Sequence, residues 1–430
     1  MAGTTQMLWT LMRNRSLSAD ALRTLQEKKL AALLRHAYHK VPYYTSLFQA
    51  AGLLPEDIRT LDDLEHVPTS DKSALRAAGP AQVLAQGVDP ETCWIERTSG
   101  SSGKLFPVYL GPHEFKLRAL VRLRASVMAG RRPRDVLCNL GRAAPPKGSL
   151  YERLGLYRTR YLSHYLSLKD QARELQQIKP DMIRTWPPSL RALLHSLDYR
   201  LSSVARPRAL ITAGEPLDPS LATRLRADLP IELFNFYTAA ECGEIAGDCP
   251  AHEGLHVHAD TVLVEILRED GSPAEPGEEG TVVVTSLEAY TMPFIRYRLG
   301  DRCATLAKPC SCGLSFPLIA APLGRLEDVV RVPSGDIRSA TALTSLVRLV
   351  APIDQFRFTQ ERLDRIVLQV VLWKEPEAAA LPTLRAKILA YLREPMEVEV
   401  QVVDTIPEQK FKFRRFVSLL NASEPSTEAP

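Results

Sequence analysis

The chain has 430 residues, more than one hydrophobic core usually supports, so its length predicts two or three domains. Lys and Arg number 54 and Asp and Glu number 50, so the charges nearly balance. The sequence also has no basic stripe with interleaved aromatic residues, and we therefore expect no nucleic-acid partner. The sequence shows no membrane-spanning run and no signal-peptide core, and its seven cysteines form no even framework of spacings, so we expect a cytoplasmic protein without a membrane partner.

The first part of the chain is predicted to form a helical covering layer. Between residues 22 and 34 leucines recur at the spacing of an amphipathic helix. Residues 39–44 are predicted to form an extended turn, residues 53–58 and 61–64 two short capped helical pieces, and residues 67–72 a proline turn with helix-capping side chains.

A loop rich in hydroxyl groups and glycine follows, between strands predicted at residues 93–96 and 107–110. Its two glycines can adopt backbone conformations closed to other residues, so its N–H groups can converge on a phosphate. The strand-to-strand setting argues against a Walker nucleotide loop, which opens a helix. From the loop alone, a phosphate site and a flexible turn are equally good interpretations. The loop consists of Thr98, Ser99, Gly100, Ser101, Ser102, Gly103 and Lys104.

Helical and strand patterns then alternate. Strands are predicted at residues 135–140, 181–185, 209–212 and 231–235, and helices at residues 114–128, 172–178, 189–196 and 219–227. This order predicts parallel strands with crossover helices, and ligands of such sheets bind at the carboxyl ends of the strands.

Two of these strand ends carry candidate site residues. Gly214 and Glu215 follow one strand, and Tyr237 and Glu241 follow the next. An aromatic ring and a carboxylate in one loop could stack a base and hold a hard cation. The alternative is that Tyr237 packs in the core and that Glu241 is a solvated surface acid.

Five motifs resemble, in order and spacing, the adenylate-forming superfamily of acyl- and aryl-CoA synthetases, luciferases and peptide-synthetase adenylation domains. These motifs are Thr98–Lys104, Ala213–Glu215, Tyr237–Glu241, Tyr297–Asp301 and Gly324–Asp328. Three stretches, residues 41–44, 249–260 and 292–301, resemble the phenylacetate-CoA ligase and CapK-like branch. The resemblance extends from about residue 20 to residue 418. It implies a ligase that uses ATP to activate a small carboxylic acid.

The resemblance also implies roles around the nucleotide. Thr98 to Lys104 would hold the β- and γ-phosphates of ATP, Gly214 and Glu215 would line the adenine slot, and Tyr237 would stack on the base. Glu241 would bind the Mg²⁺ ion that bridges the phosphates.

Two further residues would contact the sugar side of the nucleotide. Asp301 would accept hydrogen bonds from the ribose hydroxyls, and Arg325 would contact ribose or phosphate. Thr238 and Ala240 replace the glycine and threonine of the family's motif, and the loss of the threonine hydroxyl removes one phosphate contact.

The terminal motif of the family carries a lysine that neutralises the carboxylate and the α-phosphate during adenylation. Residues 406–414 resemble this motif and align Lys412 with that lysine. Lys410 is the competing candidate and a basic surface run is the plain alternative, while Phe411 replaces the usual glycine. The acid is expected to be aromatic from the resemblance, and Trp186 and Phe236 could wall its slot.

A metal site is predicted beside the nucleotide site. Cys249, Cys310 and Cys312, together with one histidine, supply enough soft ligands for a tetrahedral Zn²⁺ ion. His252 has a familiar spacing from Cys249, but a hairpin turning at residues 253–254 would return His256 to that cysteine. We choose His256, because related sequences resemble this one at that histidine, and keep His252 as the substitute ligand. A closed four-ligand site would be structural, and unrelated free thiols are the alternative.

The predicted fold is α/β, with a large adenylate-forming domain at residues 1–328, a small mobile α+β lid at residues 329–418 and a flexible tail at residues 419–430. CoA is the expected acceptor of the acyl group. A carrier protein or an amine is the alternative acceptor, and a non-catalytic nucleotide-binding scaffold is the alternative function. The sequence leaves the oligomeric state open, with a homodimer as one option.

Overall fold

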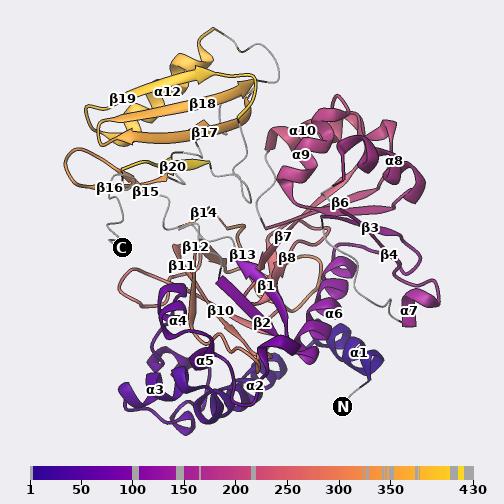
Figure 1. The fold of residues 1–430 in the computed structure, drawn as a ribbon, viewed down its shortest axis with the longest axis vertical. Coiled ribbons are helices and arrows are strands. Elements are labelled where there is room, and N and C mark those ends of the chain that lie inside the picture. The colour runs from indigo at the N-terminus through magenta and orange to yellow at the C-terminus, as the bar shows by residue number, and fades with distance from the viewer. Residues whose placement is uncertain are drawn as a thin grey trace, which may run out of the picture. The chain divides into compact units, whose positions relative to one another are not determined.

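The structure, a computed structural model, describes residues 3–98, 106–141, 150–163, 166–214, 219–322, 324–325, 329–340, 343, 346–347, 353–372, 376, 378–406 and 415–420. The chain divides into two compact units (Figure 1), a larger one of Met1–Pro216 and Pro230–Pro322 and a smaller one of Leu217–Leu229 and Leu323–Pro430. The boundary predicted at Asp328 lies outside the described residues, so residues 1–328, 329–418 and 419–430 stay predicted domains.

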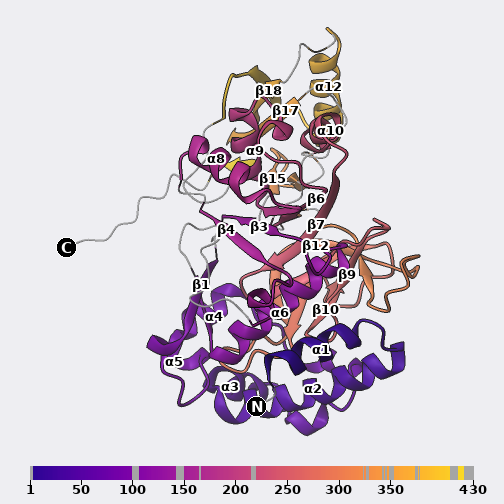
Figure 2. The same cartoon turned by 90° about the vertical axis from the view of Figure 1, so that its right-hand side faces the viewer.

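A layer of helices, which includes the 22-residue α2, lies at the N-terminal end of the larger unit and is shown in indigo in Figures 1 and 2. The extended turn predicted at residues 39–44 is wrong except at Val41, because one helix continues through Lys40 and the next begins at Pro42. Proline suits the first helical position, where no N–H group is needed. Within the described ranges no helix has both the length and the apolar character needed to cross a bilayer. The elements are α1 (Thr4–Asn14), α2 (Ala19–Lys40), α3 (Pro42–Ala50), η1 (Pro55–Asp57), η2 (Asp62–His66), α4 (Lys72–Ala78), α5 (Pro80–Val83) and η3 (Pro90–Thr92).

The loop predicted to bind phosphate follows the first strand of an antiparallel pair. Strand β1 (Trp94–Thr98) pairs with β2 (Phe106–Leu110), with Trp94 opposite Leu110 and Thr98 opposite Phe106. The predicted strand-to-strand setting is therefore confirmed.

One half of the main sheet is parallel. Neighbouring strands follow the order β7-β6-β5-β3-β4, and every one of these pairs is parallel, as the alternation of helices and strands predicts. The edge strand β4 is missed by the sequence prediction, since it is short and only its last residue is buried. The elements are β3 (Leu137–Leu140), β4 (Thr159–Leu162), β5 (Met182–Thr185), β6 (Ala209–Ala213), β7 (Glu232–Ala239), α6 (Pro112–Met128), α7 (Leu150–Arg153), α8 (Leu168–Ile178), α9 (Pro187–Ser196) and η4 (Leu201–Ser203).

The other half of the sheet is antiparallel, so the prediction of parallel sheets holds only as far as β7. From β7 onward the strand order is β8-β9-β13-β12-β11-β10, and each neighbouring pair is antiparallel. The change of direction occurs at the turn between β7 and β8, which is the turn that carries Glu241. The elements are β8 (Gly243–Gly247), β9 (Leu255–Val257), β10 (Val262–Leu267), β11 (Glu279–Ser286), β12 (Tyr297–Leu306) and β13 (Leu318–Ile319).

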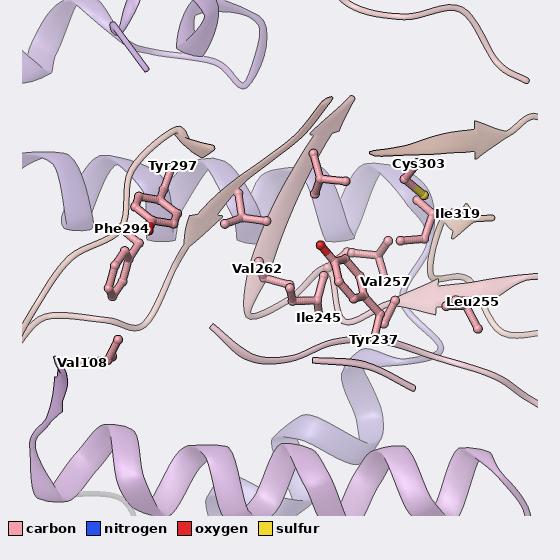
Figure 3. Close-up of a cluster of buried hydrophobic side chains, with 14 of the residues drawn as sticks. Val108, Tyr237, Ile245, Leu255, Val257, Val262, Phe294, Tyr297, Cys303 and Ile319 are labelled. Carbon is pink, nitrogen blue, oxygen red and sulfur yellow. The ribbon is translucent and has the colours of Figure 1, made fainter. Parts of the chain in front are cut away.

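The main core of the larger unit lies beside this change of direction. Figure 3 shows Tyr237 among aliphatic side chains of β8, β9 and β10, and Phe294 beside Tyr297. The core therefore holds Tyr237 and Tyr297 near the turn between β7 and β8.

The smaller unit has its own four-stranded sheet, in the order β19-β18-β17-β20. Its core combines aromatic residues of β17 with aliphatic residues of β18 and α12. The predicted α+β character is confirmed, and its motion as a lid stays a prediction. The elements are α10 (Pro219–Asp228), β14 (Gly324–Arg325), β15 (Val329–Arg331), β16 (Ile337–Ser339), β17 (Ile353–Arg362), β18 (Arg365–Leu372), α12 (Ala380–Leu392), β19 (Glu397–Val402) and β20 (Phe416–Ser418).

Candidate active site

Strand β7 directs two neighbouring aromatic residues to opposite faces of the sheet. Phe236 is buried in a cluster with residues of α6 and β5, where the guanidinium group of Arg184 lies 5.4 Å from its ring centre. Tyr237 points to the other face, and its hydroxyl group donates a 2.7 Å hydrogen bond to Oδ2 of Asp301. Burial and the neighbouring carboxylate raise the pKa of Tyr237, so the phenol stays a donor. Tyr237 and Asp301 are thus in contact, while the predicted contact of Phe236 with the acid stays a prediction.

Glu241 lies in the turn between β7 and β8 and is buried, with 7% of its surface exposed. The alternative of a solvated surface acid is therefore wrong. Its Oε1 accepts a 3.3 Å hydrogen bond from the hydroxyl group of Tyr297, and burial and this carboxylate raise the pKa of Tyr297. The residue type fits Mg²⁺, which proteins often hold through one or two carboxylates together with substrate phosphates.

Gly214 and Trp186 meet at the ends of two neighbouring parallel strands. Gly214 has φ +83°, a conformation that residues with a Cβ rarely adopt, and a Cβ added there would lie 3.6 Å from Cδ1 of Trp186. Trp186 directly follows β5 and is 39% exposed, so its indole ring presents an apolar surface at the carboxyl edge of the sheet.

Other predicted residues are not placed by the structure. The side chains of Thr98 and Arg325 are outside the description, although their backbones end β1 and lie in β14. The residues that lie wholly outside the described ranges are Ser99, Gly100, Ser101, Ser102, Gly103, Lys104, Glu215, Lys410, Phe411 and Lys412.

Four predicted zinc ligands converge in the larger unit. One ligand atom each of Cys249, His256, Cys310 and Cys312 lies within 4.8 Å of all the others. Sγ of Cys249 is 3.6 Å from Sγ of Cys310, and Sγ of Cys312 is 3.3 Å from Nε2 of His256. A tetrahedral zinc ion with bonds of about 2.0–2.3 Å separates its ligand atoms by roughly 3.3–3.8 Å. The donor set and these spacings therefore fit Zn²⁺.

The surroundings of the cluster select one of the two candidate histidines. In the β8–β9 hairpin Gly247 lies opposite His256, which is the return that the sequence predicts as one alternative. Nδ1 of His256 lies 3.1 Å from the carbonyl oxygen of Phe316, an arrangement that leaves Nε2 to face the cysteines. His252 instead lies 2.7 Å from the carboxylate of Asp248 and 3.3 Å from that of Glu232.

Sequence reasoning omits two residues that contact this site. Tyr297 begins the Tyr297–Asp301 motif. Its phenol, on the strand that leads to Asp301, was a signal from which this contact could have been predicted. Arg118 of α6 donates hydrogen bonds to Glu96 and to the carbonyl oxygens of Ala240 and Glu241. These partners lie 22 to 123 positions away in the sequence, so no local pattern indicates them.

The fold can now be compared with solved structures. A crystal structure of 2-hydroxyisobutyryl-CoA ligase in complex with 2-HIB-AMP matches with a TM-score of 0.78 over 94% of this chain and 91% of that chain, at 21% identity. A crystal structure of an anthranilate CoA ligase in complex with anthranoyl-AMP matches with a TM-score of 0.55 over 89% of this chain and 78% of that chain, at 14% identity. The fold is thus that of the adenylate-forming CoA ligases.

Comparison of sequences gives the branch within this class. The phenylacetate-coenzyme A ligase of Escherichia coli is 30% identical over 296 residues, which are 66% of this chain and 67% of the relative. That of Thermus thermophilus is 26% identical over 372 residues, 83% of this chain and 82% of the relative. No model of a protein family matches the chain. The chain belongs to the phenylacetate-CoA ligase family, as its motifs predict.

Proposed function

We propose that the protein uses ATP to convert a carboxylic acid to an acyl adenylate, with release of pyrophosphate, and then transfers the acyl group to the thiol of CoA. Membership in the phenylacetate-CoA ligase family carries this proposal. The Tyr237–Asp301 and Glu241–Tyr297 contacts at the centre of the sheet support it. An arylacetic acid is the first substrate class to test, because the relatives are named for phenylacetate and because Trp186 supplies an exposed aromatic surface.

Asp301, Tyr237 and Gly214 are proposed nucleotide contacts in the described part of the chain. Asp301 would accept hydrogen bonds from the ribose hydroxyls, with Tyr237 holding one of its oxygens in place. Tyr237 would also offer its ring to the adenine base, beside Gly214 and Glu215. Arg325 would contact ribose or phosphate.

The phosphate end needs positive charge, because a carboxylate must approach the α-phosphate. Thr98 to Lys104 would bind the β- and γ-phosphates, and Lys412 would neutralise the reacting carboxylate. Glu241 would hold Mg²⁺, which offsets phosphate charge when bound. An oxygen of the acid then bonds to the α-phosphorus as the bond to pyrophosphate breaks. In the second step the CoA sulfur bonds to the acyl carbon, its proton leaves to solvent, and AMP departs.

Exchange between ATP and labelled pyrophosphate, measured with phenylacetate, benzoate and short aliphatic acids, tests this function. We expect exchange to be fastest with an aromatic acid and AMP release in the absence of pyrophosphate to require CoA. AMP release with a carrier protein or an amine, and not with CoA, would establish the alternative acceptor. ATP binding without exchange with any acid would favour the non-catalytic scaffold.

We also propose that Cys249, His256, Cys310 and Cys312 hold one structural Zn²⁺ ion. Four protein ligands would fill the tetrahedron, so the ion would tie the β8–β9 hairpin to the loop at residues 308–314 without catalysing the reaction. Elemental analysis of the purified protein should find about one zinc per chain. His256→Ala should lose the metal, whereas the matched variant His252→Ala should keep it. Zinc-free protein, or loss only in His252→Ala, would contradict the proposed ligand set.

A further inference from the structure

Arg118 contacts three backbone or side-chain groups from two segments that the proposed mechanism uses. The side chain of Arg118 is only 10% exposed. Its Nη1 donates to the carboxylate of Glu96 at 3.0 Å and to the carbonyl oxygen of Ala240 at 2.6 Å, and its Nη2 donates to the carbonyl oxygen of Glu241 at 2.6 Å. Glu96 stands two residues before Thr98, where the predicted phosphate loop begins. One buried guanidinium group therefore contacts both the strand before that loop and the turn of the predicted metal ligand.

The chemistry of the turn explains why a guanidinium group is suited to this position. Ala240 and Glu241 lie between two strands, and buried carbonyl groups there need donors from elsewhere. A planar guanidinium group spreads its N–H donors over separate nitrogens, so Nη1 and Nη2 can serve acceptors from two segments, whereas the three donors of a lysine ammonium all radiate from one nitrogen. Since Tyr297 binds the carboxylate end of Glu241, that residue is held at both its backbone and its side chain.

A glycine and a stacked pair of aromatic rings also support the position of Arg118. Gly243 has φ +77°, and a Cβ added there would lie 3.2 Å from Cγ and 3.3 Å from Cδ of Arg118, so glycine leaves room for the arginine stem. One turn before Arg118 on α6, Phe115 stacks on Trp94 of β1, with ring centres 4.4 Å apart and planes at 13°. Strand β1 is thus fixed to α6 by a stacked ring pair and by an ion pair.

We propose that Arg118 is a positioning residue that keeps strand β1, which leads to the predicted phosphate loop, in register with the turn of Glu241. In the proposed function Glu241 would hold Mg²⁺ and residues 98–104 would bind the phosphates whose charge it offsets, and Arg118 links strand β1 to the Glu241 turn. This inference rests on the function proposed for these two segments. In it Arg118 acts through Glu96 and the Glu241 turn and makes no contact with the nucleotide.

The test compares Arg118→Gln, Arg118→Lys and Glu96→Gln with the control Arg122→Gln. Arg122 lies on the same helix, and its partner Glu244 also binds Arg184, so the control removes a comparable ion pair outside the two segments. The readouts are pyrophosphate exchange as a function of Mg²⁺, the KM values for MgATP and for the acid, and deuterium uptake of peptides covering residues 94–98 and 238–242, which exclude Glu244.

We expect Arg118→Gln to raise the Mg²⁺ concentration for half-maximal exchange by at least about tenfold, with the KM for the acid changed by less than about twofold. Arg118→Lys and Glu96→Gln should fall between this variant and the wild type. Deuterium uptake should rise in both peptides in Arg118→Gln and in neither peptide in Arg122→Gln. Equal effects of Arg118→Gln and Arg122→Gln, or equal changes in both KM values, would overturn the positioning role.

The deuterium measurement separates this inference from the proposed function. If the wild type exchanged no pyrophosphate with any acid, the proposed function would fail, and unchanged uptake in Arg118→Gln would overturn the structural coupling as well. Should Arg118→Gln fail to fold, the milder Arg118→Lys and Glu96→Gln decide the question by the same two readouts.

Discussion

Replacing Asp260 by asparagine tests the buried ion pair that joins the N-terminal helices to the sheet. Asp260 precedes β10, and its Oδ2 lies 2.6 Å from Nη1 of Arg124, with both side chains fully buried. The same Oδ2 accepts a 3.0 Å hydrogen bond from Asn14 of α1, and Nη1 of Arg124 also donates to the carbonyl oxygen of Leu11. Lys29 of α2 donates to the carbonyl oxygen of Asp260. Helices α1, α2 and α6 therefore meet at one carboxylate residue.

The size of the effect follows from burial. Removing one partner of a buried pair leaves the other charge uncompensated, which costs about 3–5 kcal/mol of the free energy of unfolding. We expect Asp260→Asn to lose about that amount for the larger unit in urea unfolding followed by tryptophan fluorescence. Arg124→Met should lose a similar amount, and the double variant should lose clearly less than the sum, because no lone charge remains.

The loss should also depend on pH. Burial alone would raise the pKa of Asp260, but Arg124, together with Lys29 and Asn14, lowers it below the ordinary value of 3.8. A carboxyl group with a lowered folded pKa contributes stability that is present above the unfolded value and is lost as pH falls through the folded one. The difference between the wild type and Asp260→Asn should therefore shrink below about pH 4. Asp270→Asn, at an exposed turn, controls for the loss of one negative charge. A loss under about 1 kcal/mol, or one that is equal at pH 7 and pH 3, would refute this reasoning.

Three further predictions concern single contacts. Tyr237→Phe removes the donor to Asp301 and should raise the KM for MgATP about fivefold in exchange kinetics while leaving the KM for the acid unchanged; an unchanged MgATP value would argue against Asp301 as a ribose ligand. Gln360→Ala removes a fully buried amide that binds both the N–H and the C=O groups of Arg331, so it should increase deuterium uptake of residues 329–339 and destabilise the smaller unit by about 1–3 kcal/mol, with no change in the larger unit. Chelation of zinc should increase deuterium uptake at residues 248–256 and 308–314, and Cys310→Ser without chelator should show an equal increase. If uptake rose in neither sample, the result would contradict a structural metal.

The sequence allowed the parallel half of the sheet to be predicted, because helices and buried strands alternate there with distinct periods. The antiparallel half has no such alternation of helices and strands, and its short strands β9 and β13 pair across a long stretch of sequence, as Leu318 does with His256. Pro42 misled the prediction in the N-terminal layer, because proline marks a turn as readily as the first residue of a helix. Local chemistry thus allowed both structures, and the burial of Tyr44 and Phe48 in the core favoured the helix.

The residues of the candidate site likewise fall into those that the local sequence indicates and those that only the structure reveals. Tyr237, Glu241 and Asp301 could be proposed because they follow strands and match family motifs. The choice of His256 over His252 needed the hairpin register, for which the sequence offered two alternatives. Arg118 could not be found, because an arginine in the middle of a helix is normally assigned to the solvent.

Helix α6 shows why that assignment fails in this protein. Its charged residues Glu114, Arg118 and Arg124 are all buried, and each binds a different segment of the larger unit. Glu114 accepts hydrogen bonds from the backbone of residues 290 and 291, Arg118 holds the Glu241 turn, and Arg124 holds Asp260. Apolar residues of α6 meanwhile pack against α1, and the two helices lie side by side in Figure 2. A helix enclosed on its polar side must pair every charge it buries, so its arginines fix where the surrounding turns lie. The two arginines should therefore differ in their effects. Arg124→Met should lower the free energy of unfolding with little effect on the Mg²⁺ dependence of exchange, and Arg118→Gln should change that Mg²⁺ dependence with a smaller loss of stability.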